Sequence, residues 1–533
     1  MRRWNGWGDE LIGDDLSAGG AGAIERVVGP ASPPRDATLT DVLAGVPASR
    51  LPRHRLVVDD AETRVRHARG QSFPDWVALR SGRLGAVPDG VAFPNDRAEV
   101  RDLLAWAEAL GARVVPYGGG TSVVGGVTPA TDGSPWLTVS LAHTAGLRTI
   151  DTGSLLATFG AGTAGPDVEA ALRARDLTLG HYPQSWELST VGGWVATRSA
   201  GQQSLGYGGI EALFAGGTVE APAGTLEMPP HPASAAGPDL RQVILGSEGR
   251  LGILTAAVLR VAPLPSRETF PTFFLPDWER ALGFTRALAR ARLPLAMVRT
   301  STPAETWTNL VLAGHERTLA ALRRYLTARG AGPGRCMVLL GLVGQRRVMA
   351  ATFAEVLAIA HAFDAVRAPA TFGRQWQRSR FRTPYLRNTL WAAGYGIDTL
   401  ETAVAWDRVP AMAASLAPVI RRGLAGDDER VHAFTHLSHV YPTGSSLYTT
   451  FVFRLAHDPD VTLERWRRLK ATASAAIVRL GGTISHQHGV GSDHAGYLVA
   501  EKGELGMAAL GDLARRFDPA GIMHPGVLLS DAR

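Results

Sequence analysis

The chain has 533 residues, of which 45% are hydrophobic and 20% are charged, a composition typical of a folded protein with a large core. Its net charge of +6 comes from arginines scattered among acidic residues, so we do not expect it to bind nucleic acid. The single cysteine, Cys336, excludes an internal disulfide and a cysteine-based metal site.

No apolar run approaches the ~18 residues that a membrane span needs. The N-terminus lacks the apolar segment of a secretory signal, and the lone cysteine is typical of a reducing compartment. We therefore expect a cytoplasmic protein. Its mildly basic surface also suits contact with anionic lipid or phosphate.

The first half of the chain predicts an arm followed by a mixed α and β region. Two tryptophans and Arg2 in the arm indicate that it docks onto the rest of the chain. Asp96 is a candidate N-cap for an amphipathic helix, and a short strand at 113–116 runs directly into a glycine turn. Further strands end with 253–261, and the prolines that follow mark a domain boundary.

The second half of the chain has a different pattern, in which strand-like runs alternate with amphipathic helices. Two strands, 430–441 and 446–455, are separated by Pro-Thr-Gly-Ser and predict a hairpin. An arginine- and aromatic-rich stretch at 367–395 predicts an irregular or helical segment. The other expected helices lie near 277–292, 316–329, 345–362, 458–480 and 505–517.

Three loops rich in glycine and hydroxyl groups lie in the first half of the chain. Consecutive backbone N–H groups in such turns bind anions, and glycine allows a ligand to approach the backbone closely. We expect the three loops to wrap one cofactor that carries a pyrophosphate. Their spacing is neither that of a nicotinamide-binding turn nor that of a Walker loop. The predicted cofactor-binding residues are Pro116, Gly118, Gly119, Gly120, Thr121, Ser122, Pro183, Ser185, Ser189, Thr190, Gly193, Thr197, Ser199, Gly246, Glu248, Gly249 and Gly252.

These loops resemble those of the vanillyl-alcohol oxidase / p-cresol methylhydroxylase family of FAD-binding proteins. Within it, the chain resembles the alkyl-dihydroxyacetonephosphate synthase (alkylglycerone-phosphate synthase) family, and the likeness covers nearly the whole length. The motifs that carry it are Arg3-Trp-Asn-Gly-Trp-Gly-Asp9, Ser189-Thr-Val-Gly-Gly-Trp-Val195, Thr399-Leu-Glu-Thr402 with Trp406-Asp-Arg-Val409, and Ser485-His-Gln-His-Gly-Val-Gly491.

The resemblance implies an α+β fold, in which a two-part FAD-binding domain is interrupted by a cap domain made of an antiparallel sheet flanked by helices. The expected division is an N-terminal arm at 1–50, the FAD-binding domain at 51–265, the cap at 266–480 and a C-terminal segment at 481–533. That last segment would complete the active site and the FAD-binding domain.

The resemblance also implies a reaction. Non-covalently bound FAD would serve to exchange the acyl chain of acyl-dihydroxyacetone phosphate for a long-chain alcohol, through an adduct at flavin N5 and without net redox change. It further implies a homodimer, and a lipid substrate implies peripheral membrane contact. An alternative is an FAD-dependent oxidoreductase of a 2-hydroxy acid or another alcohol, because related flavoproteins carry a turn like 488–491. A flavoprotein with a degenerate site is a third reading.

Four residues are predicted to carry the chemistry: His486, His488, Tyr448 and Arg299. Histidine suits removal of a proton beside a carbonyl because its pKa lies near neutrality. If the segment 486–488 is extended, both imidazoles lie on one face. The resemblance assigns proton transfer to Tyr448 and substrate binding to Arg299, whose guanidinium can form paired hydrogen bonds with phosphate or carboxylate.

The histidine-rich motif departs from the family pattern at one position. Gln487 stands where the family has a histidine, and its amide cannot shuttle a proton at pH 7. His439 and Tyr441, in the predicted hairpin, are secondary candidates for the active site.

A metal site is the remaining alternative for the histidines. The pairs 486/488 and 432/436 each offer two imidazoles, but the sequence does not obviously supply an acidic third ligand. We therefore predict no metal.

Overall fold

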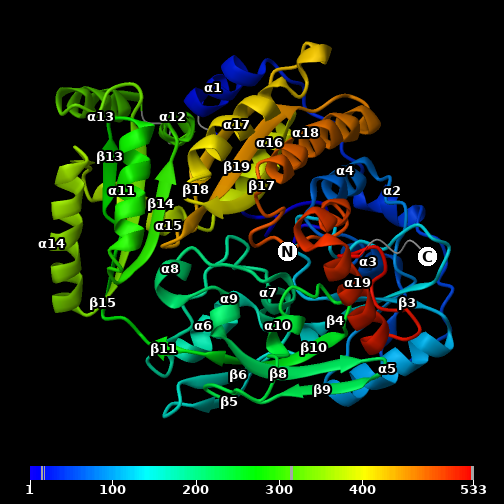
Figure 1. Cartoon of the computed structure of the whole chain (residues 1–533). Helices are drawn as coiled ribbons and strands as arrows, with labels where there is room; N and C mark the ends of the chain where they lie inside the picture. The colour runs from blue at the N-terminus through cyan, green and yellow to red at the C-terminus, as the bar shows by residue number, and fades with distance from the viewer. Residues whose placement is uncertain (14–15, 17, 313–315, 530–533) are drawn as a thin grey trace.

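The computed structural model describes residues 1–13, 16, 18–312 and 316–529. Two sheets form the region for which FAD binding is expected, called the FAD-binding domain below, in the lower half of Figure 1. The first has the order β1 (Val57–Val58), β2 (Gly90–Ala92), β4 (Trp136–Ser140), β3 (Arg113–Tyr117), with β2 and β3 parallel to β4. The second is antiparallel, in the order β5 (Leu147–Asp151), β6 (Leu156–Gly160), β10 (Ile253–Arg260), β8 (Phe214–Ala221), β9 (Gly224–Met228).

The helices of this domain include the one expected after Asp96. Its carboxylate accepts a hydrogen bond from the Glu99 backbone at 3.0 Å, which confirms the predicted N-cap. The helices are α2 (Leu39–Ala44), α3 (Ala61–Arg66), α4 (Phe73–Ser81), α5 (Arg97–Ala109), α6 (Gly165–Arg173), α7 (Val191–Thr197), α8 (Ser204–Tyr207), α9 (Ile210–Leu213) and α10 (Arg241–Ile244). A two-stranded ladder pairs β7 (Leu177–Thr178) with β11 (Ala262–Pro263).

The C-terminal segment returns to the FAD-binding domain after the cap. Its helix α19 (Val499–Phe517), red in Figure 1, packs into the core of that domain. The backbone beyond it lies beside β3, where Val114 N donates to Ile522 O at 2.8 Å and His524 N donates to Val114 O at 2.9 Å. The FAD-binding domain is therefore built from two separate parts of the sequence.

The cap is centred on an antiparallel sheet of eight strands. The order is β16 (Val366–Arg367), β13 (Thr272–Leu275), β15 (Cys336–Gly344), β14 (Leu295–Ser301), β18 (His432–Leu437), β19 (Gly444–Arg454), β17 (Tyr395–Ala405), and β12 (Arg267–Thr269) pairs with β15 off this path. β18 and β19 form the expected hairpin, with Thr435 opposite Thr449. The long strand β17, paired with β19 along its whole length, was not predicted.

Helices flank this sheet, as expected for a cap of this type (Figure 1). They are α11 (Trp278–Arg290), α12 (Pro303–Leu312), α13 (Glu316–Ala328), α14 (Arg346–Ala362), α15 (Thr371–Ser379), α16 (Thr383–Ala392), α17 (Val409–Arg422) and α18 (Pro459–Arg479). The arm contributes α1 (Ala18–Val28), which contacts α12. None of the helices in the described residues combines the length and apolarity needed to cross a bilayer.

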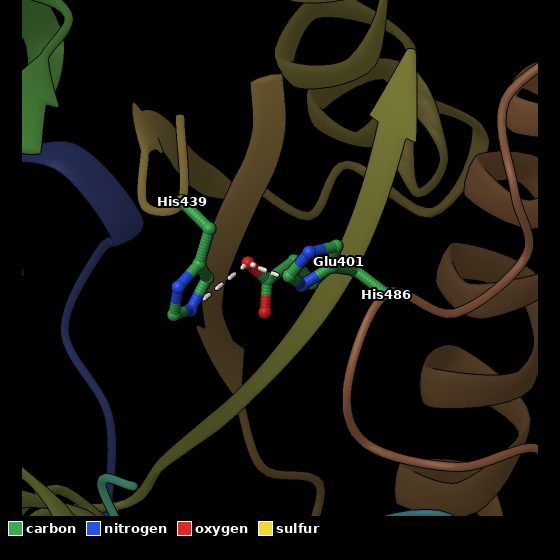
Figure 2. A group of neighbouring side chains, drawn as sticks. All are labelled: Glu401, His439 and His486. Carbon is green, nitrogen blue, oxygen red and sulfur yellow. Dashed lines mark ion pairs between the residues drawn. The ribbon is translucent and has the colours of Figure 1, made fainter. Parts of the chain in front are cut away.

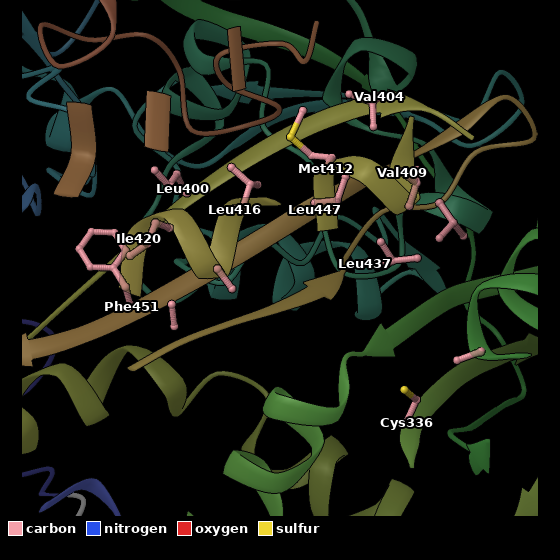
Figure 3. Packing of buried hydrophobic residues seen from close by; sticks show 14 of the residues in the cluster. Cys336, Leu400, Val404, Val409, Met412, Leu416, Ile420, Leu437, Leu447 and Phe451 are labelled. Atoms are coloured by element: carbon pink, nitrogen blue, oxygen red, sulfur yellow. The ribbon is translucent and has the colours of Figure 1, made fainter. Parts of the chain in front are cut away.

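The hydrophobic core of the cap covers one face of its sheet, so only the opposite face can line a functional site. Figure 3 shows α17 packing its buried residues against Leu400 of β17 and Leu447 and Phe451 of β19. These α17 residues follow a helical spacing: Val409, Met412, Leu416 and Ile420. Because side chains alternate along a strand, the neighbours of Leu400 and Leu447 point to the opposite face.

Candidate active site

A cavity of about 890 Å³ is lined by both the FAD-binding domain and the cap. Its volume lies at the upper end of the range for cofactor and small-molecule sites, about 300–1,000 Å³. The glycine loops line one side, and the sheet face opposite α17 lines another. From that face, strand alternation presents Arg299 of β14, His436 of β18 and Tyr448 of β19 to the cavity.

The three glycine loops interlock around this cavity. A Cβ at Gly119 would lie 1.8 Å from the carbonyl oxygen of Leu188, and one at Gly118 would lie 2.3 Å from Thr190 Oγ1. Gly249, at φ +83°, packs against Pro116 in the same way, with a Cβ placed 2.9 Å from its ring. Glycine is thus required at these positions so that the loops can pass one another and keep their backbones exposed to the cavity.

Sixteen of the seventeen predicted cofactor-binding residues line the cavity. The exception is Gly246, which lies at a neighbouring cavity of about 550 Å³. Several hydroxyls also stabilise the loops: Ser122 Oγ accepts from Gly126 N at 2.9 Å, and Ser189 Oγ accepts from Trp194 Nε1 at 2.8 Å. A cradle lined by glycines and hydroxyl groups from three loops fits a dinucleotide such as FAD.

Glu248, in the third loop, ties the FAD-binding domain to the C-terminal segment. Its two carboxylate oxygens accept hydrogen bonds from Val490 N at 2.6 Å and Gly491 N at 2.8 Å. Burial raises the pKa of Glu248 to about 7, while these two N–H groups act in the opposite direction. Two N–H donors on one carboxyl group are the pattern of a carboxylate, so we take Glu248 as ionised. It holds in place the turn that follows His488.

Arg299 is held by a buried carboxylate that the sequence analysis did not identify. Glu305 Oε1 lies 2.7 Å from Arg299 Nη2 and 2.9 Å from His436 Nδ1. Burial raises the pKa of Glu305, but the charges of His436 and Arg299 outweigh it and hold the pKa at about 2. Arg299 Nε is buried without a hydrogen-bond partner among the described residues. The guanidinium is therefore fixed in direction and keeps a donor for a ligand.

Tyr448 and His488 lie together at the cavity. Their rings meet edge to face with centroids 5.6 Å apart, and Tyr448 also stacks on His436 at 5.0 Å. Tyr448 Oη donates to Thr399 Oγ1 at 3.1 Å. Burial raises the pKa of Tyr448 and lowers the pKa of His488, so both side chains are neutral at pH 7. A neutral imidazole beside a neutral phenol can accept one proton and donate another.

His486 does not share this position. The chain bends at 486–488 instead of running extended, and His486 lines the neighbouring cavity while His488 lines the main one. The expectation that both imidazoles share one face is therefore wrong. The bend arises because Gln487 is bonded on both sides: its Nε2 donates to Glu401 Oε2 at 2.6 Å, and its Oε1 accepts from Ala200 N at 3.2 Å. Gln487 thus connects the cap to the loop after α7.

His486 instead contacts residues of the cap. Its Nε2 lies 2.7 Å from Tyr441 Oη, and its ring stacks on His439 with centroids 4.9 Å apart. Figure 2 shows the Glu401 carboxylate between the two imidazoles. Burial raises the pKa of Glu401, but the surrounding histidines outweigh it and hold the pKa at about 2. The motif around Glu401 was noticed in the sequence, but its contact with His439 and His486 was not foreseen.

The arginine-rich stretch supplies two more half-buried cations to the cavity wall, Arg380 and Arg387. The guanidinium of Arg387 lies 4.3 Å from the Trp76 ring and donates to Gln71 O. Burial lowers the pKa of Arg387 to about 10, so it remains charged at pH 7. The abundance of arginine in 367–395 was the available signal, but sequence alone did not say which arginines face inward.

Comparison with known proteins agrees with this geometry. Residues 264–528 match the family described as "FAD linked oxidases, C-terminal domain", and residues 88–228 match the "FAD binding domain" family. The chain is 28% identical to the alkyldihydroxyacetonephosphate synthase of Dictyostelium discoideum over 88% of its own length and 78% of that protein. It is 29% identical to that of Trypanosoma brucei brucei, with the same coverage. It is 25% identical to the glycolate oxidase subunit of Bacillus subtilis, over 84% of this chain and 90% of that one.

Solved structures share the fold. An alkyldihydroxyacetonephosphate synthase superposes with a TM-score of 0.83 at 24% identity, covering 98% of both chains. The 4-ethylphenol oxidase of Gulosibacter chungangensis superposes with a TM-score of 0.66 at 13% identity, covering 90% of this chain and 95% of that one. Together with the cavity and its glycine loops, these matches identify the chain as a member of the vanillyl-alcohol oxidase / p-cresol methylhydroxylase family of proteins, with FAD as its cofactor.

Proposed function

We propose that the chain is an FAD-dependent alkylglycerone-phosphate synthase-like transferase, which exchanges the acyl chain of acyl-dihydroxyacetone phosphate for a long-chain alcohol. Its similarity to the synthases of two organisms over 88% of the chain supports this reading. The observation that carries it is the apolar part of the cavity wall, which begins at Leu339, the strand neighbour of Arg299. The apolar side chains in this wall are Leu310, Leu319, Met337, Leu339, Phe372 and Trp376.

An apolar wall of this extent beside a charged group suits an amphiphile. Arg299 is fixed by Glu305 and retains an unpaired donor, which suits the phosphate of the substrate. The aliphatic chain gains free energy by leaving water, about 0.8 kcal/mol for each buried CH₂. A small 2-hydroxy acid would engage the same arginine but would leave the apolar wall uncovered, which is why we favour the transferase.

The neutral His488 imidazole accepts the proton from the substrate carbon that carries the ester. Tyr448, beside it, turns its hydroxyl from Thr399 Oγ1 to one oxygen atom of the substrate and donates its hydrogen bond there. FAD, when bound, supplies an electrophilic centre and ends each cycle in its oxidised form. The fatty acid leaves as its carboxylate, the alcohol takes its place and releases its hydroxyl proton to the departing carboxylate or to water, and His488 returns its own proton to the same carbon. Arg299 holds the phosphate throughout, so the intermediate stays in position between the two half-reactions.

The experiment is an anaerobic incubation of FAD-loaded protein with acyl-dihydroxyacetone phosphate and hexadecanol. We expect release of fatty acid, formation of the ether and no net loss of flavin absorbance. A parallel incubation tests a panel of 2-hydroxy acids. Bleaching of the flavin by a hydroxy acid, with no fatty acid released from the lipid, would contradict the transferase and support an oxidoreductase.

The proposal includes non-covalent FAD, a homodimer and a cytoplasmic protein that meets lipid at the membrane surface. Acid precipitation should leave all the flavin in the supernatant. Light scattering after size exclusion measures the mass of the assembly, and flotation with anionic vesicles measures lipid contact. Flavin in the pellet, a monomeric mass or absence of flotation would each refute the corresponding point.

A further inference from the structure

Three potential metal ligands converge beside the main cavity, from parts of the chain far apart in sequence (Figure 2). Glu401 lies on β17, His439 lies between β18 and β19, and His486 lies in the C-terminal segment. One carboxylate oxygen and one nitrogen from each imidazole lie within 4.8 Å of one another. Glu401 Oε1 is 3.9 Å from His439 Nε2 and 3.5 Å from His486 Nδ1. The carboxylate that the sequence did not supply to the histidines is therefore present in the fold.

The remaining polar atoms of these side chains have other partners that fix their orientation. His439 Nδ1 lies 2.9 Å from Ser204 Oγ, and His486 Nε2 lies 2.7 Å from Tyr441 Oη. Glu401 Oε2 accepts from Gln487, while Oε1 also accepts from Ser446 Oγ at 2.7 Å. An outer partner on the distal nitrogen of each histidine is the arrangement that orients imidazoles toward a metal ion.

Hydrogen bonding alone does not account for the centre of the cluster. The two carboxylate–imidazole distances, 3.9 and 3.5 Å, exceed the usual limit of about 3.2 Å for an N–H···O hydrogen bond. His486 Nδ1 is buried and has no hydrogen-bond partner among the described residues. In the described part of the chain, Glu401 forms ion-pair contacts with histidines and none with arginine or lysine. A buried carboxylate without a fixed cation is costly, so the cluster calls for a positive charge at its centre.

We propose that Glu401, His439 and His486 bind a divalent transition-metal cation of the Zn²⁺ class, with water in the fourth position. Bonds of about 2.0–2.2 Å in a tetrahedral site separate the ligand atoms by about 3.3–3.5 Å. The observed carboxylate–imidazole distances of 3.5 and 3.9 Å lie close to that range, and the two imidazole nitrogens, which lie within 4.8 Å of each other, would move closer together when the ion binds. Two imidazoles and one carboxylate are a ligand set common for zinc.

The ion would fasten the cap to the C-terminal segment. It would join β17 and the β18–β19 turn to the bend at 486–488, and His488 lies two residues after His486. His486 is then a metal ligand, and His488 alone of the two acts on the substrate. The role of the ion is positional, so this inference is independent of the substrate named above.

The test measures metal in FAD-loaded protein that has been treated with EDTA and dialysed against Zn²⁺. After desalting, mass spectrometry of the metal should give one Zn²⁺ per chain. Glu401→Gln and His486→Asn should each weaken binding at least tenfold, because loss of even an outer partner costs that much. His432→Gln is the matched control, since His432 is also a buried histidine of the cap but pairs with Thr308 outside the cluster. Its affinity should equal that of the unmodified protein.

If the unmodified protein retains no stoichiometric Zn²⁺, the proposal is wrong, and the three side chains share protons instead of binding a metal ion. Variants that still bind one equivalent would overturn it as well. Flavin absorbance and circular dichroism check that the variants fold. A second measurement needs no variant: Co²⁺ in the unmodified protein should give the visible d–d bands of a nitrogen- and oxygen-ligated tetrahedral ion, as a difference from the Zn²⁺ form. Absence of those bands would also refute the site.

Discussion

Glu305→Gln tests the electrostatic basis of the substrate site. The change keeps the shape of the side chain but removes the charge that holds Arg299 Nη2 at 2.7 Å. Arg299 would then lack a counter-charge in a largely buried position. We expect a less stable cap and a weaker hold on an anionic substrate, with a higher KM and a smaller change in kcat.

The magnitude follows from the pKa of Glu305, which is held at about 2 against a reference of 4.5. A difference of that size corresponds to about 3 kcal/mol of unfolding free energy at neutral pH. Burial lowers the pKa of His436, so this imidazole is neutral at pH 7 and Arg299 alone supplies the positive charge. We therefore expect a loss of about 2 kcal/mol at pH 7, because the His436 contribution is absent there.

The pH dependence has a definite sign. A carboxylate with a depressed folded-state pKa stabilises the protein above its unfolded-state pKa, and this contribution disappears as the pH falls through the folded-state value. The difference between the unmodified protein and Glu305→Gln should thus increase as the pH falls through the lowered pKa of His436, whose charge then also faces Glu305, and it should shrink as the pH falls from 4.5 toward about 2.

Denaturant unfolding of the FAD-loaded protein, followed by tryptophan fluorescence at several pH values, measures this difference. Glu355→Gln is the control, because Glu355 is an exposed residue of α14. It should change stability by less than about 0.5 kcal/mol at every pH. A Glu305→Gln variant as stable as the control at pH 7, or a difference that grows as the pH falls from 4.5 toward about 2, would refute the reasoning.

Four further predictions concern the cofactor loops, the catalytic residues and the core. His488→Ala should lower kcat by about 10²–10⁴ and leave FAD bound; loss of flavin absorbance would show that His488 is a cofactor ligand instead. Arg299→Lys should raise KM for the phosphate-bearing substrate about tenfold or more, and an unchanged KM in steady-state assays would contradict its anion-binding role. Gly119→Ala should prevent FAD binding in a reconstitution titration, because the added Cβ would lie 1.8 Å from the Leu188 carbonyl oxygen; normal affinity would show that the loops can separate. Leu416→Ala, in the fully buried face of α17, should lower the free energy of unfolding by about 2–5 kcal/mol in denaturant titrations, and a loss under about 1 kcal/mol would mean that the core closes around the gap.

Features that depend on neighbouring residues could be predicted from the sequence. The Asp96 cap depends on a hydrogen bond to a residue three positions on, and the β18–β19 hairpin depends on a short turn between alternating strands. The strand β17 was missed because most of its residues are buried on both faces, so it lacks the polar–apolar alternation that marks a strand. The bend at 486–488 was missed because it depends on bonds from Gln487 to Glu401 and Ala200, which are distant in sequence.

The sequence by itself determined the cofactor chemistry of this protein. Glycine and hydroxyl positions in three short loops specify a backbone cradle, and backbone geometry is a local property that motifs record. Only the tertiary structure decided how the acidic and histidine side chains group. Glu305 meets Arg299 and His436, while Glu401 meets His439 and His486, because α12, the β18–β19 turn and the C-terminal segment pack onto the cap sheet beside residues that are remote in sequence. A buried carboxylate acquires its role from the charges that folding places around it, and their identity is not encoded in the residues beside it along the chain.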